Sequence, residues 1–408
     1  MKKSVLKNYA KLIAKKGANV QKGQDVIISA GLDQPEFVKM VVEECYKLGA
    51  RRVKVEWSYQ PLSKISIRYQ SIKTMTTFEK WELEKMEHRA VTLPATIYLE
   101  SDDPDGNKGI DQKKMMIVSQ KNYPIVKPYR DRMENHYQWV IAAVPGVAWA
   151  KKVFPDLPKK KAVEKLWEAI LYTSRVDDDP IQAWNNHNEN LKKKCEWLNS
   201  LHLKNLYYKS SNGTDFRVGL LPNVNFLAGE EKLSDKDVYF NPNIPSEECF
   251  VTPRKGDIEG KVVSTKPLSY QGELIENFYI IFKDGKVSEA HAEKHEELLQ
   301  KMINMDKGAS MLGEVALVPY DSPISQSGIL FYNTLFDENA SCHLALGQGF
   351  YNCVSNYEKY TLEEMHEMGI NDSMIHVDFM IGSRDLQIIG ECEDGSKVVI
   401  FENGTWAK

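Results

Sequence analysis

The sequence lacks the features that would place the protein in a membrane or outside the cell. Its six cysteines are scattered without a CxxC pair, and disulfide frameworks are characteristic of small secreted domains rather than of a 408-residue chain. No apolar region follows the charged N-terminus, so no secretory signal is predicted. The longest apolar stretch, residues 139–150, is interrupted by Pro145 and Gly146 and is too short to cross a bilayer. We therefore expect a cytoplasmic protein with free thiols and no membrane partner.

The chain also lacks a surplus of charge of either sign. Lysine and arginine number 53 against 57 aspartates and glutamates, which gives a formal net charge of -4. The basic stretches at 159–161 and 192–194 are short and flanked by acids, as is typical of solvated helix faces. This balance does not favour binding to nucleic acid. With 42% apolar residues, the chain can build two domains with substantial cores.

Several common catalytic and cofactor motifs are missing as well. No GxGxxG or GxxxxGKS/T segment lies at a strand–helix turn, so no dinucleotide or P-loop site is predicted. The GxSxG element of many serine hydrolases and the HExxH motif of many zinc proteases are both absent. Cys342 adjoins His343, but neighbours in sequence rarely reach the geometry that a thiol–imidazole pair requires.

The first half of the chain alternates between strand and helix patterns. A buried strand is predicted at 26–29, an amphipathic helix at 35–48 and an alternating strand at 52–57. This is a βαβ unit, which requires parallel pairing and an α/β layer. Further strands are predicted at 95–99 and 139–144. We therefore expect an α/β fold in which residues 1–190 form an N-terminal α/β domain.

Strand patterns dominate the second half of the chain. Turn signals such as Asn212-Gly213 and Asp284-Gly285 separate several of them. We expect the domain boundary near residue 190 and a strand-rich α+β domain at residues 191–408. Strands are predicted at 206–209, 214–221, 261–264, 278–282, 314–318 and 374–381.

His376 and Asp378 are the first candidates for chemistry. They lie in an apolar segment, and because side chains alternate along a strand they point to one face while Val377 points to the other. An imidazole and a carboxylate on a buried strand are costly without partners, and a metal ion would satisfy both. A His–Asp hydrogen bond within a core also explains the pair, and the pair taken alone favours that simpler explanation.

Other polar residues of this half are ambiguous when taken one by one. Glu314 opens an apolar strand, where a carboxylate is usually a solvated strand end. Glu247 and Glu248 follow a turn signal, and adjacent acids in a turn are most often exposed. Glu338 and His343 are five residues apart, so they could share a site or lie on a surface helix.

Taken together, these side chains suit a metal site. The second half holds four or five candidate carboxylates and two candidate imidazoles, a ligand set appropriate to Zn, Co or Mn. If the carboxylates converge, their mutual repulsion requires cations, and two divalent ions would neutralise four of them. Spacing alone does not establish that they converge.

Five segments carry a resemblance to a known family. They are NIPSEE at 243–248, STKPLSY at 264–270, GEVALV at 313–318, NASCHLALG at 339–347 and HVDFMIG at 376–382. These segments resemble the aminopeptidase T-like metallopeptidases, and residues 144–155 and 390–406 are also similar to that family. The resemblance runs through most of the chain. It implies a two-metal aminopeptidase that hydrolyses the N-terminal residue of short peptides.

The resemblance also implies the residues of the site. Two divalent ions (Zn, Co or Mn) would be held by Glu248, Glu314, Glu338, His343, His376 and Asp378. Glu247 and Glu248 could exchange places, and Glu338 could be a ligand or the general base. The family has a tyrosine seven residues after the histidine that corresponds to His343. Here that position is Phe350, so Tyr351 is the candidate for a catalytic tyrosine.

The expected reaction uses a water activated by both metals, which also polarise the scissile carbonyl. Glu338 or Glu247 would accept the proton of the water and pass it to the leaving amine. Similar enzymes are homodimers with an enclosed cavity, so a homodimer is expected. Two alternatives stay open. One is a non-catalytic, metal-stabilised peptide-binding protein, which Phe350 favours. The other is a different two-metal hydrolase such as a phosphoesterase, for which Arg384 is the nearest cationic group to the candidate ligands.

Overall fold

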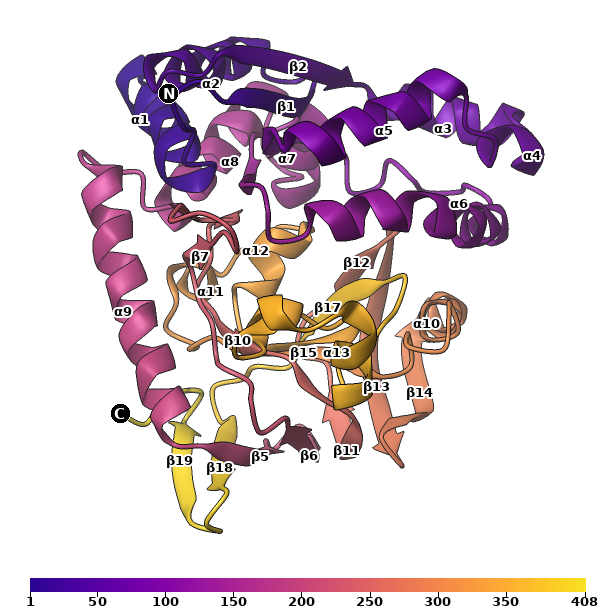
Figure 1. Ribbon diagram of the computed structural model, residues 1–408, viewed down its shortest axis with the longest axis vertical. Helices are drawn as coiled ribbons and strands as arrows, with labels where there is room; N and C mark the ends of the chain where they lie inside the picture. The colour runs from indigo at the N-terminus through magenta and orange to yellow at the C-terminus, as the bar shows by residue number, and fades with distance from the viewer. The chain divides into compact units, whose positions relative to one another are not determined.

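The computed structural model, shown in Figure 1, describes residues 1–408. The chain forms two compact units. The first contains residues 1–187 and 230–246, and the second contains residues 188–229 and 247–408. The chain passes from the first unit to the second within helix α9 (Pro180–Ser200). The expected boundary near residue 190 lies in the same helix, but the sequence patterns do not predict the return of residues 230–246 to the first unit.

A five-stranded parallel sheet forms the centre of the first unit. Its strand order is β2-β1-β3-β4-β9, and every neighbouring pair is parallel. The strands are β1 (Asp25–Gly31), β2 (Arg52–Ser58), β3 (Ala95–Glu100), β4 (Trp139–Ala143) and β9 (Asn243–Ile244). Strand β9 is added to the edge by the segment that returns from the second unit. The predicted parallel α/β layer is confirmed.

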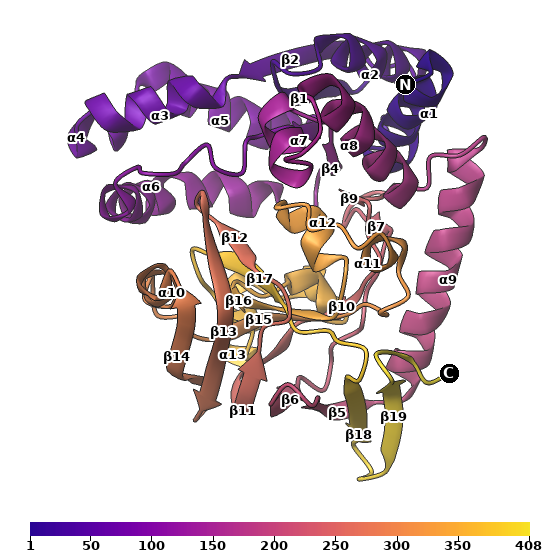
Figure 2. The same cartoon turned by 180° about the vertical axis from the view of Figure 1, so that it is seen from behind.

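The first unit also contains helices. They are α1 (Lys3–Leu12) with the π-helical turn η1 (Ile13–Gly17), α2 (Pro35–Lys47), α3 (Gln60–Tyr69), α4 (Ile72–Met75), α5 (Lys80–Thr92), α6 (Gln112–Met133), α7 (Val147–Val153) and α8 (Lys159–Thr173). Seen from behind, α7 and α8 lie side by side (Figure 2). The rings of Tyr9, Phe37 and Trp167 join α1, α2 and α8 in one buried aromatic cluster, with ring centroids 5.3 to 6.3 Å apart. A short hairpin, β7 (Glu231–Lys232) and β8 (Tyr239–Phe240), belongs to the returning segment.

The second unit is rich in antiparallel strands, as expected. Its larger sheet has nine strands in the order β12-β13-β11-β6-β5-β18-β19-β20, with β14 also paired to β13. They are β5 (Leu203–Lys209), β6 (Asp215–Leu220), β11 (Pro253–Val263), β12 (Leu268–Tyr270), β13 (Glu273–Lys283), β14 (Lys286–Lys294), β18 (Gln387–Cys392), β19 (Lys397–Glu402) and β20 (Thr405–Trp406). The helical segments are α10 (Glu296–Ile303), α11 (Pro323–Gln326), α12 (Thr334–Glu338), α13 (Leu362–Met368), η2 (Tyr351–Cys353) and η3 (Tyr357–Lys359).

A smaller sheet of four strands has two chemically different faces. Its order is β10-β15-β16-β17, from β10 (Cys249–Val251), β15 (Leu312–Leu317), β16 (His343–Gly347) and β17 (His376–Met380). One face adds apolar side chains to the core of the unit, among them Val315, Leu344 and Phe379. Because side chains alternate along a strand, the residues between these point to the opposite face. None of the helices in the structure is long and apolar enough to cross a membrane.

Candidate metal centre

The second face of the four-stranded sheet collects the polar residues. Across the three strands β15, β16 and β17, Glu314 pairs with Ala345 and Ala345 pairs with Asp378. His343 and His376 each lie two residues from one of these positions along a strand, so they point to the same face. Strand pairing therefore brings together residues as distant in the sequence as Glu314 and Asp378.

A bulge at Gly313 positions the Glu314 side chain. The pairing of β15 with β16 shifts register between Leu312 and Glu314. A Cβ atom at Gly313 would lie only 2.1 Å from the backbone oxygen of Gln348, so this close approach requires glycine. Bulges re-aim side chains, and here the result is a buried carboxylate, 4% exposed, instead of the solvated strand end that the apolar pattern suggests.

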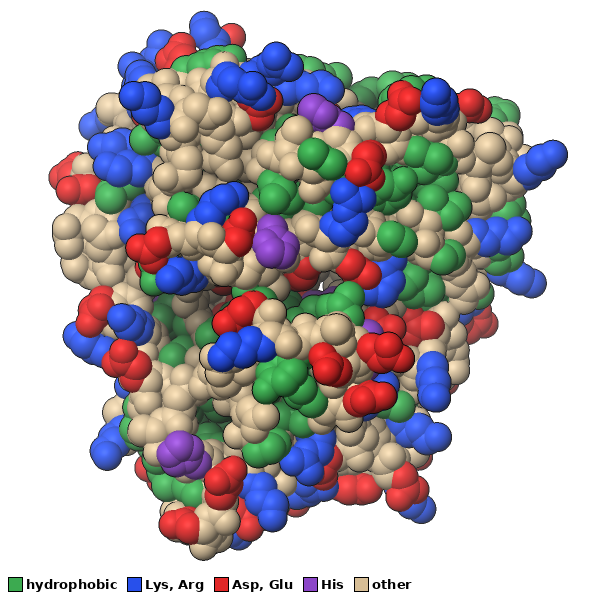
Figure 3. Space-filling view, in the orientation of Figure 1, with side chains coloured by type: hydrophobic (Ala, Val, Ile, Leu, Met, Phe, Trp, Pro, Cys, Tyr) green, Lys and Arg blue, Asp and Glu red, His purple; other side chains and the backbone are tan.

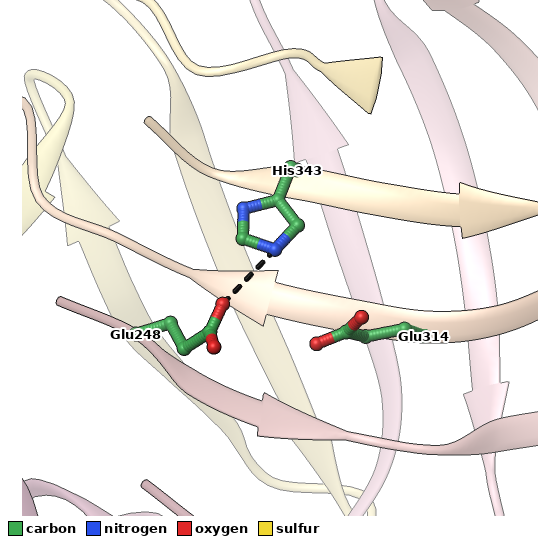
Figure 4. Close-up of side chains that lie close together, drawn as sticks. All are labelled: Glu248, Glu314 and His343. Atoms are coloured by element: carbon green, nitrogen blue, oxygen red, sulfur yellow. Dashed lines mark ion pairs between the residues drawn. The ribbon is translucent and has the colours of Figure 1, made fainter. Parts of the chain in front are cut away.

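Glu248, Glu314 and His343 form the first group of possible ligands. One potential ligand atom from each lies within 4.8 Å of the others, and all three residues are buried. The Nε2 atom of His343 is 3.0 Å from Oε2 of Glu248. Figure 4 shows the Glu314 carboxylate directed toward that of Glu248, with the imidazole of His343 above them.

Glu314, His376 and Asp378 form the second group. Their potential ligand atoms also lie within 4.8 Å of one another. The Nε2 atom of His376 is 3.0 Å from Oε2 of Glu314 and 3.4 Å from Oδ1 of Asp378. Glu314 belongs to both groups, so its carboxylate lies where it can be shared between two neighbouring cations.

Backbone carbonyl groups fix the orientation of both imidazoles. Nδ1 of His343 is 3.1 Å from the carbonyl oxygen of Ser341, and Nδ1 of His376 is 2.8 Å from that of Gln348. A carbonyl oxygen only accepts hydrogen bonds, so each Nδ1 carries the proton and donates it. Each Nε2 atom is then left facing the carboxylates, which is the usual arrangement for a histidine that binds a metal.

Burial and mutual repulsion dominate the electrostatics of this face. Burial raises the pKa of Glu314 to about 7, and the charges of Asp378 and Glu248 act in the same direction. Burial also raises the pKa of Glu338 well above its usual range, together with the charges of Asp378, Glu248 and Glu314. Burial lowers the pKa of His343, but the hydrogen bond to Glu248 outweighs it and the pKa rises to about 9. Without cations, the carboxylates of this face therefore compete for protons.

The residues of this face fit divalent metal ions. Four carboxylates (Glu248, Glu314, Glu338 and Asp378) are at most 9% exposed, and two imidazoles lie among them. The buried Oδ1 atom of Asp378 is 3.4 Å from Nε2 of His376 and makes no shorter hydrogen bond, so a cation would complete its surroundings. Oxygen and imidazole ligands together suit Zn, Co and Mn.

Two further predicted residues, Glu338 and Glu247, belong to neither of the two groups of possible ligands. Glu338 ends α12 and is buried beside Asp378. Glu247 is buried and its backbone N–H donates to Oδ1 of Asn339, 2.7 Å away, but Glu247 is in neither group of ligand atoms. Of the two adjacent glutamates, Glu248 is the one that contacts His343.

Tyr351 and Phe350 have different surroundings. The hydroxyl group of Tyr351 is 2.9 Å from Nε2 of His366, and the ring belongs to a small apolar cluster with residues such as Met365. The ring of Phe350 has its centroid 4.9 Å from that of His376 and 5.1 Å from that of Phe250. The catalytic role of Tyr351 stays a prediction.

Three residues that shape the site have little or no signal in the sequence. Asn339 and Ala345 lie within the NASCHLALG segment, where no chemical argument distinguishes them, and the carbonyl group of Gln348 has no side-chain signal at all. The thiol alternative fails on structural grounds. Cys342 is buried and donates to the carbonyl oxygen of Val318 at 3.3 Å, and burial raises the pKa of its thiol to about 12.

The buried acidic face of the antiparallel sheet has the ligand types that metal-binding proteins use. Comparisons with known proteins show which family the chain belongs to. A family model described as thermophilic metalloprotease (M29) matches residues 2–406. Aminopeptidase AmpS of Bacillus subtilis (strain 168) is 41% identical, covering 98% of this chain and 98% of its own length. Aminopeptidase 2 of Geobacillus stearothermophilus is 40% identical, covering 98% of this chain and 97% of its own length. The solved structure of wild-type AmpT from Thermus thermophilus is 34% identical, with a TM-score of 0.90 and 100% coverage of both chains.

The chain belongs to the thermophilic metalloprotease (M29) family. The family resemblance, the α/β fold and the enzyme class, a metal-dependent aminopeptidase, are thereby confirmed. Membership also confirms the use of divalent metal and of peptide substrates.

Proposed function

We propose that this chain removes the first residue of short peptides with two divalent cations, held by Glu248, Glu314, Glu338, His343, His376 and Asp378. The observation that carries the proposal is that Glu314 is shared between two groups of ligand atoms, Glu248–Glu314–His343 and Glu314–His376–Asp378. A single cation would leave one group of buried carboxylates uncompensated, whereas two divalent cations neutralise four carboxylates.

The side chains have different tasks in this proposal, and Glu338 is a candidate for two of them. When bound, the two cations supply an activated water near neutral pH and polarise the scissile carbonyl. Glu338 lies outside both ligand groups, and its pKa is raised by burial and by neighbouring carboxylates. It is therefore the side chain suited to take up the proton of the attacking water and to return it to the leaving amine. Glu338 also lies close enough to Asp378 to act as a ligand.

The acidic character of the site favours substrates with a free N-terminus. The ammonium group of a peptide carries positive charge, which the buried carboxylates attract. Glu247, buried next to Glu248, is the candidate to hold this ammonium group or to share the role of general base. An N-terminal ammonium that must be bound for reaction makes the enzyme an exopeptidase.

The metal identity, oligomeric state and location complete the proposal. Zn, Co and Mn all match the mixed carboxylate and imidazole ligands. We propose a homodimer, supported by helix α3, which has no buried residue and exposes Leu62, Ile65 and Tyr69. A cytoplasmic location is supported by the six free cysteines, all of them buried.

Metal content and aminopeptidase activity measured on one preparation test the proposed function. We expect two metals per chain, release of a chromophore from a leucyl amide, loss of activity after chelation, and recovery with Zn, Co or Mn. Glu314→Ala is expected to abolish both metal binding and activity, because it removes the shared carboxylate. Glu391→Gln is the matched control, since Glu391 bonds Tyr207 and Asn205 on the larger sheet.

Other results would point elsewhere. A folded, metal-replete chain that cleaves no aminoacyl substrate would favour the peptide-binding alternative, to which the Phe350 ring beside His376 lends support. Cleavage of phosphoryl substrates only would favour another two-metal hydrolase. A chain that binds no metal and keeps its activity would contradict the site assignment.

A further inference from the structure

We propose that Asn339 is a positioning residue that ties the Glu338 carboxylate to the segment carrying Glu248. Asn339 follows α12 directly and its side chain is fully buried. Its side-chain oxygen accepts a hydrogen bond from the backbone N–H of Glu247 at 2.7 Å. Its side-chain nitrogen donates to the carbonyl oxygen of Leu335 at 3.0 Å and to Oε1 of Glu338 at 3.3 Å. The inference rests on the metal-binding role proposed for these glutamates.

The partners of Asn339 leave only one orientation for its amide. The Glu247 N–H is a donor, so it must face the amide oxygen. The Leu335 carbonyl and the Glu338 carboxylate are acceptors, so they must face the two N–H bonds of the amide nitrogen. All three bonds are satisfied in the interior, where an unmade hydrogen bond costs most. The amide is therefore a rigid connection between two segments that are 92 positions apart in the sequence.

This connection reaches both glutamates of the site that do not lie within a strand. Glu314, His343, His376 and Asp378 are fixed by the pairing of β15, β16 and β17. Glu248 directly precedes β10 and Glu338 ends α12, so neither carboxylate lies within a paired strand. Asn339 donates to a carboxylate oxygen of one and anchors the backbone one residue before the other. Asn339 therefore links the two carboxylates that lie outside the strands, in addition to the strand register that directs Glu248.

The neutral amide of Asn339, with its two N–H donors, is required for this role, and not only the size of the side chain. Aspartate has nearly the same shape as asparagine and could still accept from the Glu247 N–H. Its second oxygen, however, would face the Leu335 carbonyl and the Glu338 carboxylate. All three oxygens are hydrogen-bond acceptors, so they would repel one another. Asn339→Asp should therefore push Glu338 out of place while the packing around residue 339 is conserved.

The test compares Asn339→Asp with the parent chain in metal binding and in kinetics. Partners that orient metal ligands typically change metal affinity or activity by about 10- to 100-fold when they are removed. We expect that Asn339→Asp weakens the binding of one cation by this factor, measured on the metal-free chain by competition with a chromophoric chelator. With Co bound, the visible absorption spectrum should change. In saturating metal, kcat should fall by about 10- to 100-fold with KM changed little.

Asn205 provides a matched control for a general effect of losing a buried amide. Its amide nitrogen donates to Glu391 at 3.1 Å, its oxygen accepts from Arg217 at 2.8 Å, and it is 8% exposed. Asn205→Asp should leave metal affinity, the Co spectrum and kcat unchanged. Asn339→Ala creates no repulsion between acceptors. Its metal affinity and its kcat should therefore lie between those of the parent chain and those of Asn339→Asp.

The outcomes separate this inference from the proposed function. If the parent chain binds no metal, the proposed site itself is wrong. If the parent chain binds two metals while Asn339→Asp keeps the affinity, spectrum and kcat of the parent, the positioning role is overturned. The positioning role is also overturned if Asn205→Asp matches the losses of Asn339→Asp, since the effect would then be one of stability alone.

Discussion

At the scale of single residues, the smallest side chain on the acidic face of the four-stranded sheet is as informative as the charged ones. Ala345 lies on the central strand, paired on one side with Glu314 and on the other with Asp378. It is fully buried, and its side chain is a single methyl group on the strand between those two residues. A larger side chain at this position would point to the same face and fill the region where cations are proposed to bind.

We predict that Ala345→Leu reduces metal binding more than it reduces folding. Inserting bulk into a packed interior costs about 1–3 kcal/mol, which corresponds to roughly a 5- to 150-fold loss if it falls on the binding step. Metal content after dialysis and the melting temperature of the metal-free chain are the measurements. Ala345→Gly, which adds no bulk, serves as the control. Full occupancy of both metals in Ala345→Leu would show that the cations do not sit above this residue.

At the scale of the element, local patterns can be read from the sequence and partnerships between strands cannot. The alternation in 374–381 predicts that His376 and Asp378 share a face, and β17 has that geometry. The pairing of β17 with β16, and of β16 with β15, places Leu344 in the apolar core on the opposite face. Such contacts join residues far apart in sequence, so no local pattern reports them. The family resemblance, and not strand periodicity, supplies the candidate ligands.

The same limit explains the ambiguity between Glu247 and Glu248. The two residues follow a cis peptide bond between Ile244 and Pro245 and precede β10. Which of them faces His343 is decided by the register of β10 against β15, in which Cys249 pairs with Leu317. A shift of one residue would exchange the two carboxylates, because neighbouring side chains point to opposite faces.

An ion cluster between β2 and α5 makes the stability of the first unit dependent on pH. Glu56 on β2 bonds Arg89 and Lys85 on α5 at 2.5 and 3.1 Å, and its side chain is 23% exposed. Burial raises the pKa of Glu56, but these two cations outweigh it and the pKa falls to about 2. Because the folded-state pKa is lowered, the stabilisation is complete above the ordinary pKa of about 4.5 and is lost as pH falls toward 2.

We predict that Glu56→Gln lowers the free energy of unfolding of the first unit at pH 7 by about 1–2 kcal/mol, allowing for solvent screening. The difference from the parent chain should shrink between pH 4.5 and pH 2. Urea unfolding at pH 7 and at pH 3 measures both effects. Glu84→Gln, at an exposed pair with Lys80, is the control and should change little. An equal loss at both pH values would contradict the electrostatic explanation.

At the scale of the whole molecule, exposed apolar side chains on α3 support the proposed homodimer. Leu62, Ile65 and Tyr69 on α3 are 60%, 52% and 79% exposed. Their spacing places them along one side of the helix. Figure 3 shows hydrophobic side chains gathered over the part of the surface that Figure 1 labels α3 and α5. Exposed apolar patches of this kind are typical of protein interfaces.

We predict that Ile65→Asp converts a dimer into single chains. A charge at the centre of an apolar interface is left without a partner on association, which opposes binding. Light scattering should give twice the mass of one chain for the parent and one mass for the variant. Val399→Asp changes an exposed apolar residue on β19 and should leave the mass unchanged. A variant Ile65→Asp with the mass of the parent would place the interface elsewhere.

The return of residues 230–246 to the first unit has a consequence for biosynthesis. The N-terminus of a chain leaves the ribosome first, and folding units commonly form in order from the N-terminus to the C-terminus. Here the edge strand β9 is made only after residues 188–229 of the second unit have emerged. Until β9 is synthesised, one side of β4 in the nascent first unit is therefore unpaired. Synthesis of the second unit begins before the first unit can complete its sheet. The two units are interleaved in time as well as in sequence, and neither can be excised as a continuous fragment.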